Sequence, residues 1–124
     1  MKTILIVDDE TASAEALAEL LQEEGFRVYC AYNGREGLTR VAEVNPDLII
    51  SDFMMPVMNG GEMGQALRGA EATRDIKILM NSGLSEASVR AYFTGYDAFL
   101  RKPYPLDDVL AAIHRLLGDD APPA

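Results

Sequence analysis

The chain has 124 residues, the length of one ordinary domain, and its 11 Lys and Arg against 20 Asp and Glu give a formal net charge of −9. This charge argues against binding to nucleic acid or anionic lipid, because few basic side chains are present to neutralise phosphates. A single cysteine, Cys30, excludes an internal disulfide. No long apolar stretch predicts a signal peptide or membrane span, so we expect a cytoplasmic protein.

Apolar runs alternate with amphipathic stretches along the first half of the chain. The run TILIV at Thr3–Val7 is rich in β-branched residues and predicts a buried parallel strand. Helical spacing of apolar residues follows over Thr11–Glu24 and again over Glu36–Val44. Strand patterns separate and follow these helices, at Arg27–Ala31 and at Leu48–Ser51, the second ending at an aspartate.

The alternation continues through the second half. A loop, three helices and two strands are predicted there, in chain order at Phe53–Gly60 (loop), Glu62–Arg68 (helix), Ile76–Met80 (strand), Glu86–Phe93 (helix), Ala98–Leu100 (strand) and Leu106–Leu117 (helix). Three glycines, Gly61, Gly64 and Gly69, weaken the helix prediction around Glu62–Arg68, since an interior glycine costs about 1 kcal/mol.

Five strand–helix units in one domain predict a single α/β fold. We expect a five-stranded parallel sheet with helices on both faces, a doubly wound, flavodoxin-like (βα)5 arrangement. The domain is expected over residues 1–118, followed by a flexible C-terminal tail over residues 119–124.

Polar side chains follow the predicted strands at the points where they end. Asp8 and Asp9 follow the first strand, Asp52 the third, Ser82 the fourth and Lys102 the fifth. The carboxyl ends of parallel strands form one edge of a sheet, where ligands bind in open α/β folds. These side chains are therefore expected to converge there.

Three carboxylates in one place are costly unless a cation neutralises them. Oxygen ligands of this kind suit Mg²⁺, which often shares a phosphate ligand. A carboxylate can also act as a nucleophile and form an aspartyl-phosphate. Lys102, one of three lysines in the chain, would counter the charge of the carboxylates or of an incoming phosphoryl group.

Three motifs make the chain resemble the CheY-like receiver domain of two-component response regulators. They are ILIVDDE at residues 4–10, PDLIISDFMMPVMNG at residues 46–60 and LRKPYP at residues 100–105. The resemblance covers about residues 2–117, nearly the whole chain, and the spacings match the family well.

The resemblance implies roles for the acidic residues. Asp52 would accept a phosphoryl group from the phosphohistidine of a sensor histidine kinase or a histidine phosphotransfer protein. Asp8, Asp9 and Asp52 would bind Mg²⁺ together with the main-chain carbonyl of Met54. The output would pass to an effector protein, an output domain or a phospho-dependent homodimer, without direct nucleic-acid or membrane binding by this chain.

The resemblance also implies a switch, with some departures from the family pattern. Ser82 would follow the phosphoryl group and Lys102 would pair with its oxygens, with a cis bond between Lys102 and Pro103. The aromatic switch position falls on Phe99, which lacks the hydroxyl of the more usual tyrosine. Gly61 stands where a larger apolar residue is usual. About two residues are missing between Ser82 and Lys102, which would trim the fourth helix or its flanking loop.

Three alternatives to a phosphorylated signalling domain remain. A Mg²⁺-dependent aspartyl-phosphate phosphatase would need a second acid two residues after its nucleophile, where this chain has Met54. A flavodoxin-like cofactor carrier would need a phosphate-cradling loop after the first strand, where this chain has three acids. A degenerate receiver would keep the fold and act only as a binding module.

Overall fold

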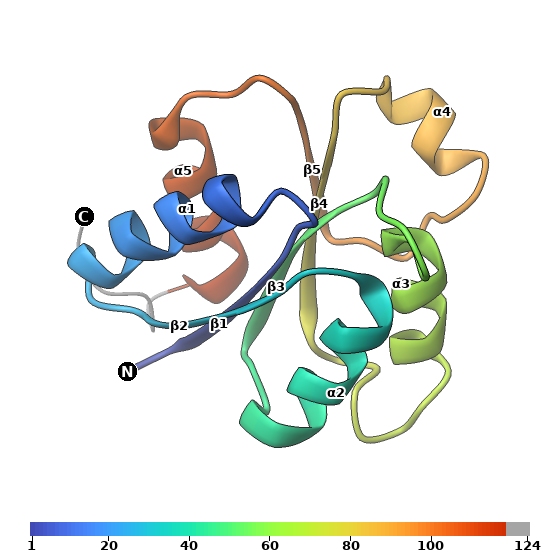
Figure 1. Cartoon of the computed structure of the whole chain (residues 1–124), viewed down its shortest axis with the longest axis horizontal. Coiled ribbons are helices and arrows are strands. Elements are labelled where there is room, and N and C mark those ends of the chain that lie inside the picture. Colours follow the sequence, from blue (N-terminus) through green and yellow to red (C-terminus); the bar gives the residue numbers. More distant parts are fainter. Residues whose placement is uncertain (119–124) are drawn as a thin grey trace.

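The computed structural model describes residues 1–118, and the predicted tail at residues 119–124 lies outside the described residues. Its strands are β1 (Thr3–Val7), β2 (Arg27–Ala31), β3 (Leu48–Asp52), β4 (Lys77–Ser82) and β5 (Ala98–Arg101). Its helices are α1 (Thr11–Glu23), α2 (Gly34–Val44), α3 (Gly60–Arg68), α4 (Glu86–Arg90) and α5 (Leu106–Leu117). The strictly alternating order of strands and helices is the predicted one (Figure 1).

All five strands are parallel and lie in the order β2-β1-β3-β4-β5. The predicted doubly wound fold is therefore confirmed. The direction of winding reverses between β1 and β3, and a reversal of this kind leaves a crevice at the carboxyl ends of the two strands. The end of β1 and the end of β3 are the places where the sequence has its aspartates.

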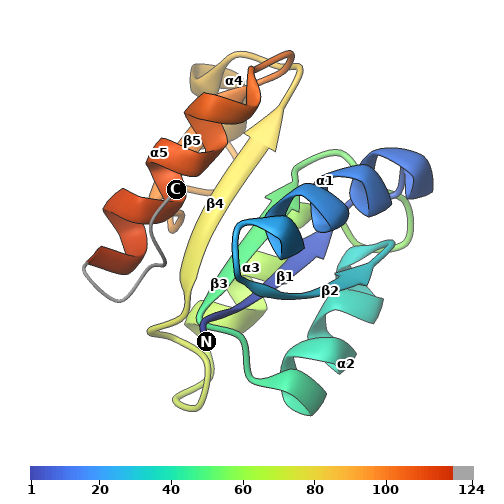
Figure 2. The ribbon, with the colours of Figure 1, turned by 90° about the vertical axis from the view of Figure 1, so that its left-hand side faces the viewer.

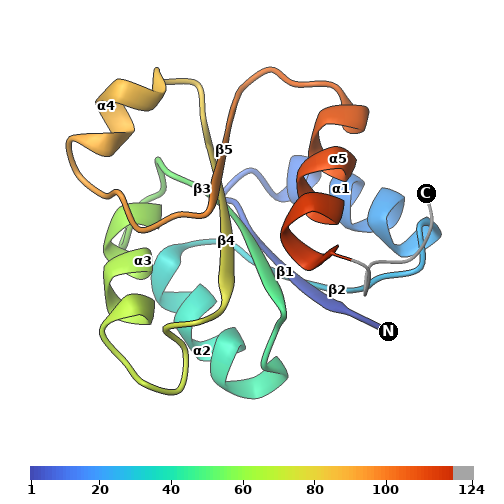
Figure 3. The same cartoon turned by 180° about the vertical axis from the view of Figure 1, so that it is seen from behind.

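The helices cover both faces of the sheet. Figures 1 and 3, which view the molecule from opposite sides, show α1 and α5 on one side of the strands and α2, α3 and α4 on the other. Figure 2 shows α1 and α5 both in front of the sheet. In residues 1–118, no helix is long and apolar enough to cross a bilayer.

Alternation along the strands explains this layering. Because successive side chains of a strand point to opposite faces, Ile4 and Ile6 of β1 pack with α1 and α5, whereas Leu5 and Val7 pack with α2, α3 and α4. All five residues of β1 are buried, as expected for a central strand that helices cover on both faces.

Three predicted strand ends differ from the structure at the carboxyl edge. β3 includes Asp52, β4 continues to Ser82 instead of ending at Met80, and β5 continues to Arg101 instead of ending at Leu100. The reason is ladder pairing: Asp52 lies beside Asn81, and Ser82 lies beside Arg101 of β5. Polar side chains that are typical of turns are here the last members of buried strands.

The fourth helix is shorter than predicted. α4 ends at Arg90, three residues before the predicted end at Phe93, which agrees with the trimming expected in this part of the chain. Beyond it, the buried ring of Phe93 lies on α3. A Cβ added at Gly64 would come within 2.5 Å of this ring, and one at Gly61 within 3.3 Å of the Phe93 Cβ.

Gly64, with Gly61 one turn before it, therefore leaves the space on α3 that Phe93 occupies. Gly95 borders the same space, because a Cβ there would lie 2.7 Å from the Phe93 ring. The absent side chain at Gly61 and the short α4 thus belong to one packing arrangement, in which an aromatic ring from the following loop fills the space over α3.

We expect Gly64→Ala to destabilise the domain by about 1–2 kcal/mol, because the new methyl group displaces a buried ring. Helix propensity alone predicts the opposite sign, a gain of about 1 kcal/mol. Urea unfolding measures the difference. Gly83→Ala is the matched control, since a Cβ there meets nothing within 4 Å, and we expect a change within about 0.5 kcal/mol. A stabilised Gly64→Ala variant would contradict the packing of the Phe93 ring against Gly64.

Candidate functional site

The three predicted carboxylates converge at the point where the winding of the sheet reverses. Asp8 and Asp9 directly follow β1, and Asp52 ends the adjacent strand β3. One carboxylate oxygen from each residue can be chosen so that all three lie within 4.8 Å of one another. Asp8 and Asp52 are buried and Asp9 is exposed, so the cluster has two inner acids and one outer acid.

Backbone hydrogen bonds hold Asp8 in place. Its N–H donates to the carbonyl of Ala31 on β2 at 3.0 Å, which extends the sheet pairing by one residue. Its Oδ1 accepts the N–H of Glu10 at 2.9 Å. The second oxygen, Oδ2, therefore remains for the interior of the cluster.

Lys102, which follows the edge strand β5, also reaches this cluster. Its Nζ lies 3.5 Å from Asp8 Oδ2 and 3.4 Å from Asp52 Oδ2. Its backbone N–H donates to the carbonyl of Ser82 at 2.8 Å, which anchors the chain after β5 to the end of β4. The expected cis bond between Lys102 and Pro103 is present.

Ser82 lies at the end of β4 with only 1% of its surface exposed. Its Oγ accepts the N–H of Leu84 at 3.1 Å, so the hydroxyl is engaged with the loop that leads to α4. Ser82 lines an open cavity of about 440 Å³ together with the acidic residues Asp9 and Asp52 and with Lys102.

Met54 follows β3 and lines this cavity too. Its side chain is 59% exposed, so the thioether is not part of the core. The structure therefore brings together all the residues that the sequence singled out for phosphoryl and metal chemistry. The part of the Met54 carbonyl in metal binding stays a prediction.

The electrostatics of the cluster are dominated by burial. Burial raises the pKa of Asp52; the ammonium of Lys102 opposes this, and the Asp8 carboxylate adds to it. Burial lowers the pKa of Lys102, but the carboxylates of Asp52 and Asp8 outweigh it and raise this pKa above its usual value. The lysine thus stays charged, while its charge does not fully stabilise the Asp52 carboxylate.

One further polar residue at this edge was not recognised from the sequence. Asn81 lies beyond the predicted strand Ile76–Met80, but in the structure it belongs to β4, with 4% of its surface exposed. Its Oδ1 is buried without a hydrogen-bond partner in the described part of the chain. The signal in the sequence was a polar amide directly after the apolar run ILM, at a position that continues the strand.

The donor set of the cluster fits a hard divalent cation. Three carboxylates face one ammonium in residues 1–118, so negative charge remains in excess. Carboxylate oxygens are the ligands that Mg²⁺ prefers, and Mg²⁺ commonly uses one or two of them with waters and phosphate oxygens. A cation here would also lower the electrostatic cost of bringing a phosphoryl group to Asp52.

We expect Asp52→Asn to raise the free energy of unfolding at neutral pH when divalent cations are removed with EDTA. A carboxyl whose pKa is raised by folding holds its proton more tightly in the native state, so stability falls as pH rises from the ordinary value of 3.8 through the raised pKa. The neutral amide avoids this loss. Urea unfolding at several pH values measures the effect, and the gain should shrink toward pH 3.8. An Asp52→Asn variant that is less stable at neutral pH would contradict this electrostatic account.

Comparisons with known proteins agree with this geometry. The signal receiver domain of a signal transduction histidine kinase from Syntrophus aciditrophicus has a TM-score of 0.87 and 35% identity, covering 94% of this chain and 90% of that one. The response regulator TrrA from Thermotoga maritima, solved in complex with Mg²⁺ and BeF, has a TM-score of 0.83 and 33% identity, covering 94% and 99%.

Among curated proteins, the chain is similar to the DNA-binding dual master transcriptional regulator RpaA of Synechocystis sp. The two are 34% identical over 119 residues, covering 94% of this chain and 49% of RpaA. The chain spans about half the length of the curated relatives it matches. The family model described as the response regulator receiver domain matches residues 4–114. With that match over most of its length, and with the predicted fold in place, the chain belongs to the response regulator receiver domains, the phospho-accepting units of two-component regulators.

Proposed function

We propose that Asp52 is the phosphoacceptor of this receiver domain, with Asp8, Asp9 and the Met54 carbonyl as its partners in Mg²⁺ binding. The observation that carries this proposal is the convergence of three carboxylates and Lys102 at the β1–β3 edge. Receiver domains are generally signalling modules and not enzymes, and we assign this chain the same role.

In the proposed reaction, an Asp52 carboxylate oxygen attacks the phosphorus of a phosphohistidine on a sensor histidine kinase or phosphotransfer protein. An O–P bond forms, the P–N bond breaks, and the released imidazole takes up a proton from solvent. A bound Mg²⁺ would neutralise charge on the transferring phosphoryl oxygens. Lys102 Nζ, which lies 3.4 Å from Asp52 Oδ2, pairs with the same oxygens after transfer.

Phosphorylation is proposed to act on α4 through Ser82. The Ser82 hydroxyl oxygen accepts the Leu84 N–H at 3.1 Å, and Ser85, the next residue, caps α4 by accepting the N–H of Ser88. A phosphoryl group on Asp52 would accept the Ser82 O–H, and turning the hydroxyl toward it would draw the Ser82 Oγ away from the Leu84 N–H. This differential contact would shift the balance between two conformations of the loop before α4.

The signal can continue through aromatic contacts even though Phe99 has no hydroxyl. The ring of Tyr96 lies 5.9 Å from that of Phe99, and its hydroxyl donates to Glu86 Oε2 of α4 at 2.6 Å. Tyr96 therefore supplies a polar connection from the aromatic cluster to α4. The receiving partner is proposed to be an effector protein, an output domain or a second phosphorylated copy.

The phosphatase alternative is weakened further by the structure around Met54. The residue two positions after Asp52 presents an exposed thioether and no acid. The degenerate-receiver alternative makes a different prediction from ours, because it expects no reaction at Asp52. Phosphorylation in vitro therefore separates the two.

We expect acetyl phosphate with Mg²⁺ to add one phosphoryl group to the wild-type chain, seen by intact-mass spectrometry. EDTA should abolish the addition, and Asp52→Asn should lose it by at least about tenfold, because the nucleophile is absent. Asp107→Asn, at an exposed acid in the first turn of α5, is the matched control and should react normally. Equal mass gain in Asp52→Asn would exclude Asp52 as the acceptor.

We expect Ser82→Ala to bind BeF₃⁻ and Mg²⁺ but to transmit less of the change. In the wild type, amide NMR signals of Leu84, Glu86, Tyr96 and Phe99 should shift on BeF₃⁻ addition. In Ser82→Ala these shifts should shrink, because no hydroxyl is present to leave Leu84, while signals beside Asp52 should still move. Full shifts at Leu84 and Glu86 in the variant would contradict the proposed route.

A further inference from the structure

The amide of Asn81 is a buried polar group that the proposed phosphoryl transfer does not use. The residue is 4% exposed, and its Oδ1, with less than 1 Å² of accessible surface, has no hydrogen-bond partner in residues 1–118. A buried acceptor without a donor is unfavourable, and an apolar side chain would avoid that cost. Because almost none of this oxygen is open to solvent, a donor for it has to come from the side chains packed around it.

Strand register places Asn81 between Asp52 and the strand that leads to Lys102. Asn81 lies beside Asp52 of β3 on one side and beside β5 on the other. Leu79 and Ile50, which precede Asn81 and Asp52 by two residues, both pack with α1 and α5. Since side chains two residues apart in a strand share a face, the Asn81 amide and the Asp52 carboxylate are neighbours on this face of the sheet.

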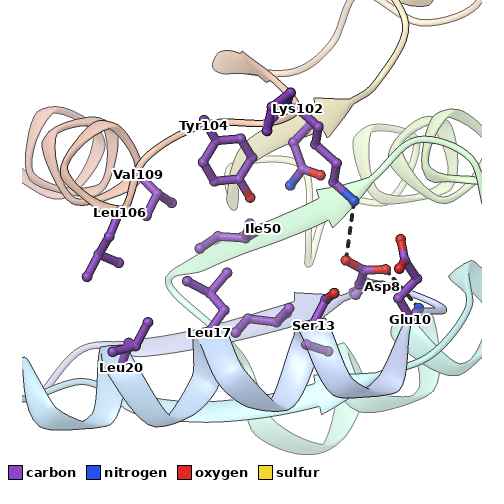
Figure 4. Close-up of a pocket in the computed structure, with 15 residues that line it drawn as sticks. Asp8, Glu10, Ser13, Leu17, Leu20, Ile50, Lys102, Tyr104, Leu106 and Val109 are labelled. Atoms are coloured by element: carbon purple, nitrogen blue, oxygen red, sulfur yellow. Dashed lines mark hydrogen bonds and ion pairs between the residues drawn. The ribbon is translucent and has the colours of Figure 1, made fainter.

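The Lys102 side chain has to cross β4 to reach the carboxylate cluster. The strand order is β2-β1-β3-β4-β5, and Lys102 directly follows β5. Its Nζ nevertheless lies 3.4 Å from Asp52 Oδ2 and 3.5 Å from Asp8 Oδ2, beyond the end of β4. Asn81 is the last residue of β4 that points to this face, and it lines the same cavity between α1 and α5 as Lys102 (Figure 4). The lysine side chain thus passes over Asn81.

The Lys102 ammonium has donors to spare. It carries three N–H groups, and its two ion pairs, at 3.4 and 3.5 Å, are longer than the about 2.7–2.9 Å of strong charge-assisted bonds. When Asp52 carries a phosphoryl group, the negative charge lies on the phosphoryl oxygens and no longer on the carboxylate. One N–H of Lys102 then bonds to a phosphoryl oxygen, and the remaining N–H groups need other acceptors.

Tyr104 also carries a hydrogen-bond donor at this cavity. In Figure 4, however, its hydroxyl points toward Ile50, whereas the Lys102 side chain extends toward Asp8. A hydrogen bond from a charged donor is also stronger than one from a neutral hydroxyl. Lys102 is therefore the better partner for the unpaired oxygen.

We infer that Asn81 is a positioning residue for Lys102. In the phosphorylated domain, Asn81 Oδ1 accepts one N–H of the Lys102 ammonium and holds this ammonium against the phosphoryl oxygens on Asp52. The amide is unpaired in the structure because the ammonium extends past it to the free carboxylates of Asp8 and Asp52. The inference rests on the proposed function, since it assigns a contact to the phosphorylated state.

Binding of BeF₃⁻ with Mg²⁺ measures this contact, because BeF₃⁻ stands in for the phosphoryl group. Asn81→Leu keeps the size of the side chain and removes the acceptor. We expect this variant to bind BeF₃⁻ about tenfold more weakly than the wild type, since a hydrogen bond to a charged group is lost. Urea unfolding without BeF₃⁻ and Mg²⁺ should show a stability at least equal to that of the wild type, because the unpaired acceptor is gone. An amide that served only the fold would lower the stability when removed and leave the affinity unchanged.

The Lys102 ammonium reports on the contact directly. The chain has three lysines, so lysine labelled with ¹⁵N gives three side-chain NMR signals, and Lys102→Met assigns one of them. With BeF₃⁻ bound, the Lys102 ammonium protons should exchange with water at least about threefold more slowly in the wild type than in Asn81→Leu. Thr3→Val, at a buried polar residue at the other end of β1, is the matched control and should behave as the wild type in affinity and exchange.

A double-mutant cycle then identifies the donor. In a Lys102→Met background, Asn81→Leu should change the BeF₃⁻ affinity by less than about twofold, because the partner is absent. A tenfold loss in that background would assign Asn81 Oδ1 to another donor, such as Tyr104, and would overturn the inference. Wild-type affinity and exchange in Asn81→Leu would overturn it as well. A wild type that does not bind BeF₃⁻ would instead refute the proposed function, and the inference with it.

Discussion

The excess negative charge at the carboxyl end of β1 and β3 is the constraint on which the rest of this site depends. Asp8 and Asp52 are buried beside each other, and in residues 1–118 the paired cation is Lys102, at 3.4–3.5 Å from both. Burial raises the pKa of Asp52 despite this lysine. The domain thus holds a carboxylate at a cost in stability, and a cation or a modified aspartate changes the balance. Sites that keep such groups commonly do so for function.

Backbone hydrogen bonds hold the strand ends at this edge of the sheet. The Lys102 N–H bonds to the Ser82 carbonyl, the Phe53 N–H bonds to the Asn81 carbonyl, and the Asp8 N–H bonds to the Ala31 carbonyl. Every residue of the cluster is thereby carried by a strand end whose position is set by the sheet. The loop from Gly83 to Ser85 is held partly by side-chain bonds: the Ser82 hydroxyl accepts the Leu84 N–H, and the Arg101 Nε–H donates to the Gly83 carbonyl. The proposed switch requires this loop to move while the sheet keeps its shape.

The segment between α4 and β5 shows how the chain accommodates its short fourth helix. Phe93 packs on the glycines of α3, and Arg68 donates to the carbonyls of Gly95, Arg74 and Ile76 and to Asp97 Oδ2. Asp97 in turn accepts the N–H of Ile78, so the segment between α4 and β5 is joined to both α3 and β4. The region of the proposed switch thus lies between two sets of contacts. At one end Phe93 packs on α3 and Arg68 pairs with Asp97, and at the other end Ser82 bonds to Leu84.

The sequence by itself determined the alternation of five strands with five helices, because the apolar runs and helical spacings are local signals. It also predicted that Asp8, Asp9 and Asp52 lie close together, since parallel strands bring the groups that follow them to one edge of the sheet. What only the tertiary structure decided is how those groups are held. Strand pairing extended β3 and β4 through Asp52 and Ser82, and a contact between α3 and the distant Phe93 explained Gly64, one of the glycines that weakened the helix prediction. The buried, unpaired Asn81 likewise depends on neighbours far away in the chain. No local pattern encodes such contacts, because they arise only when separate elements pack together.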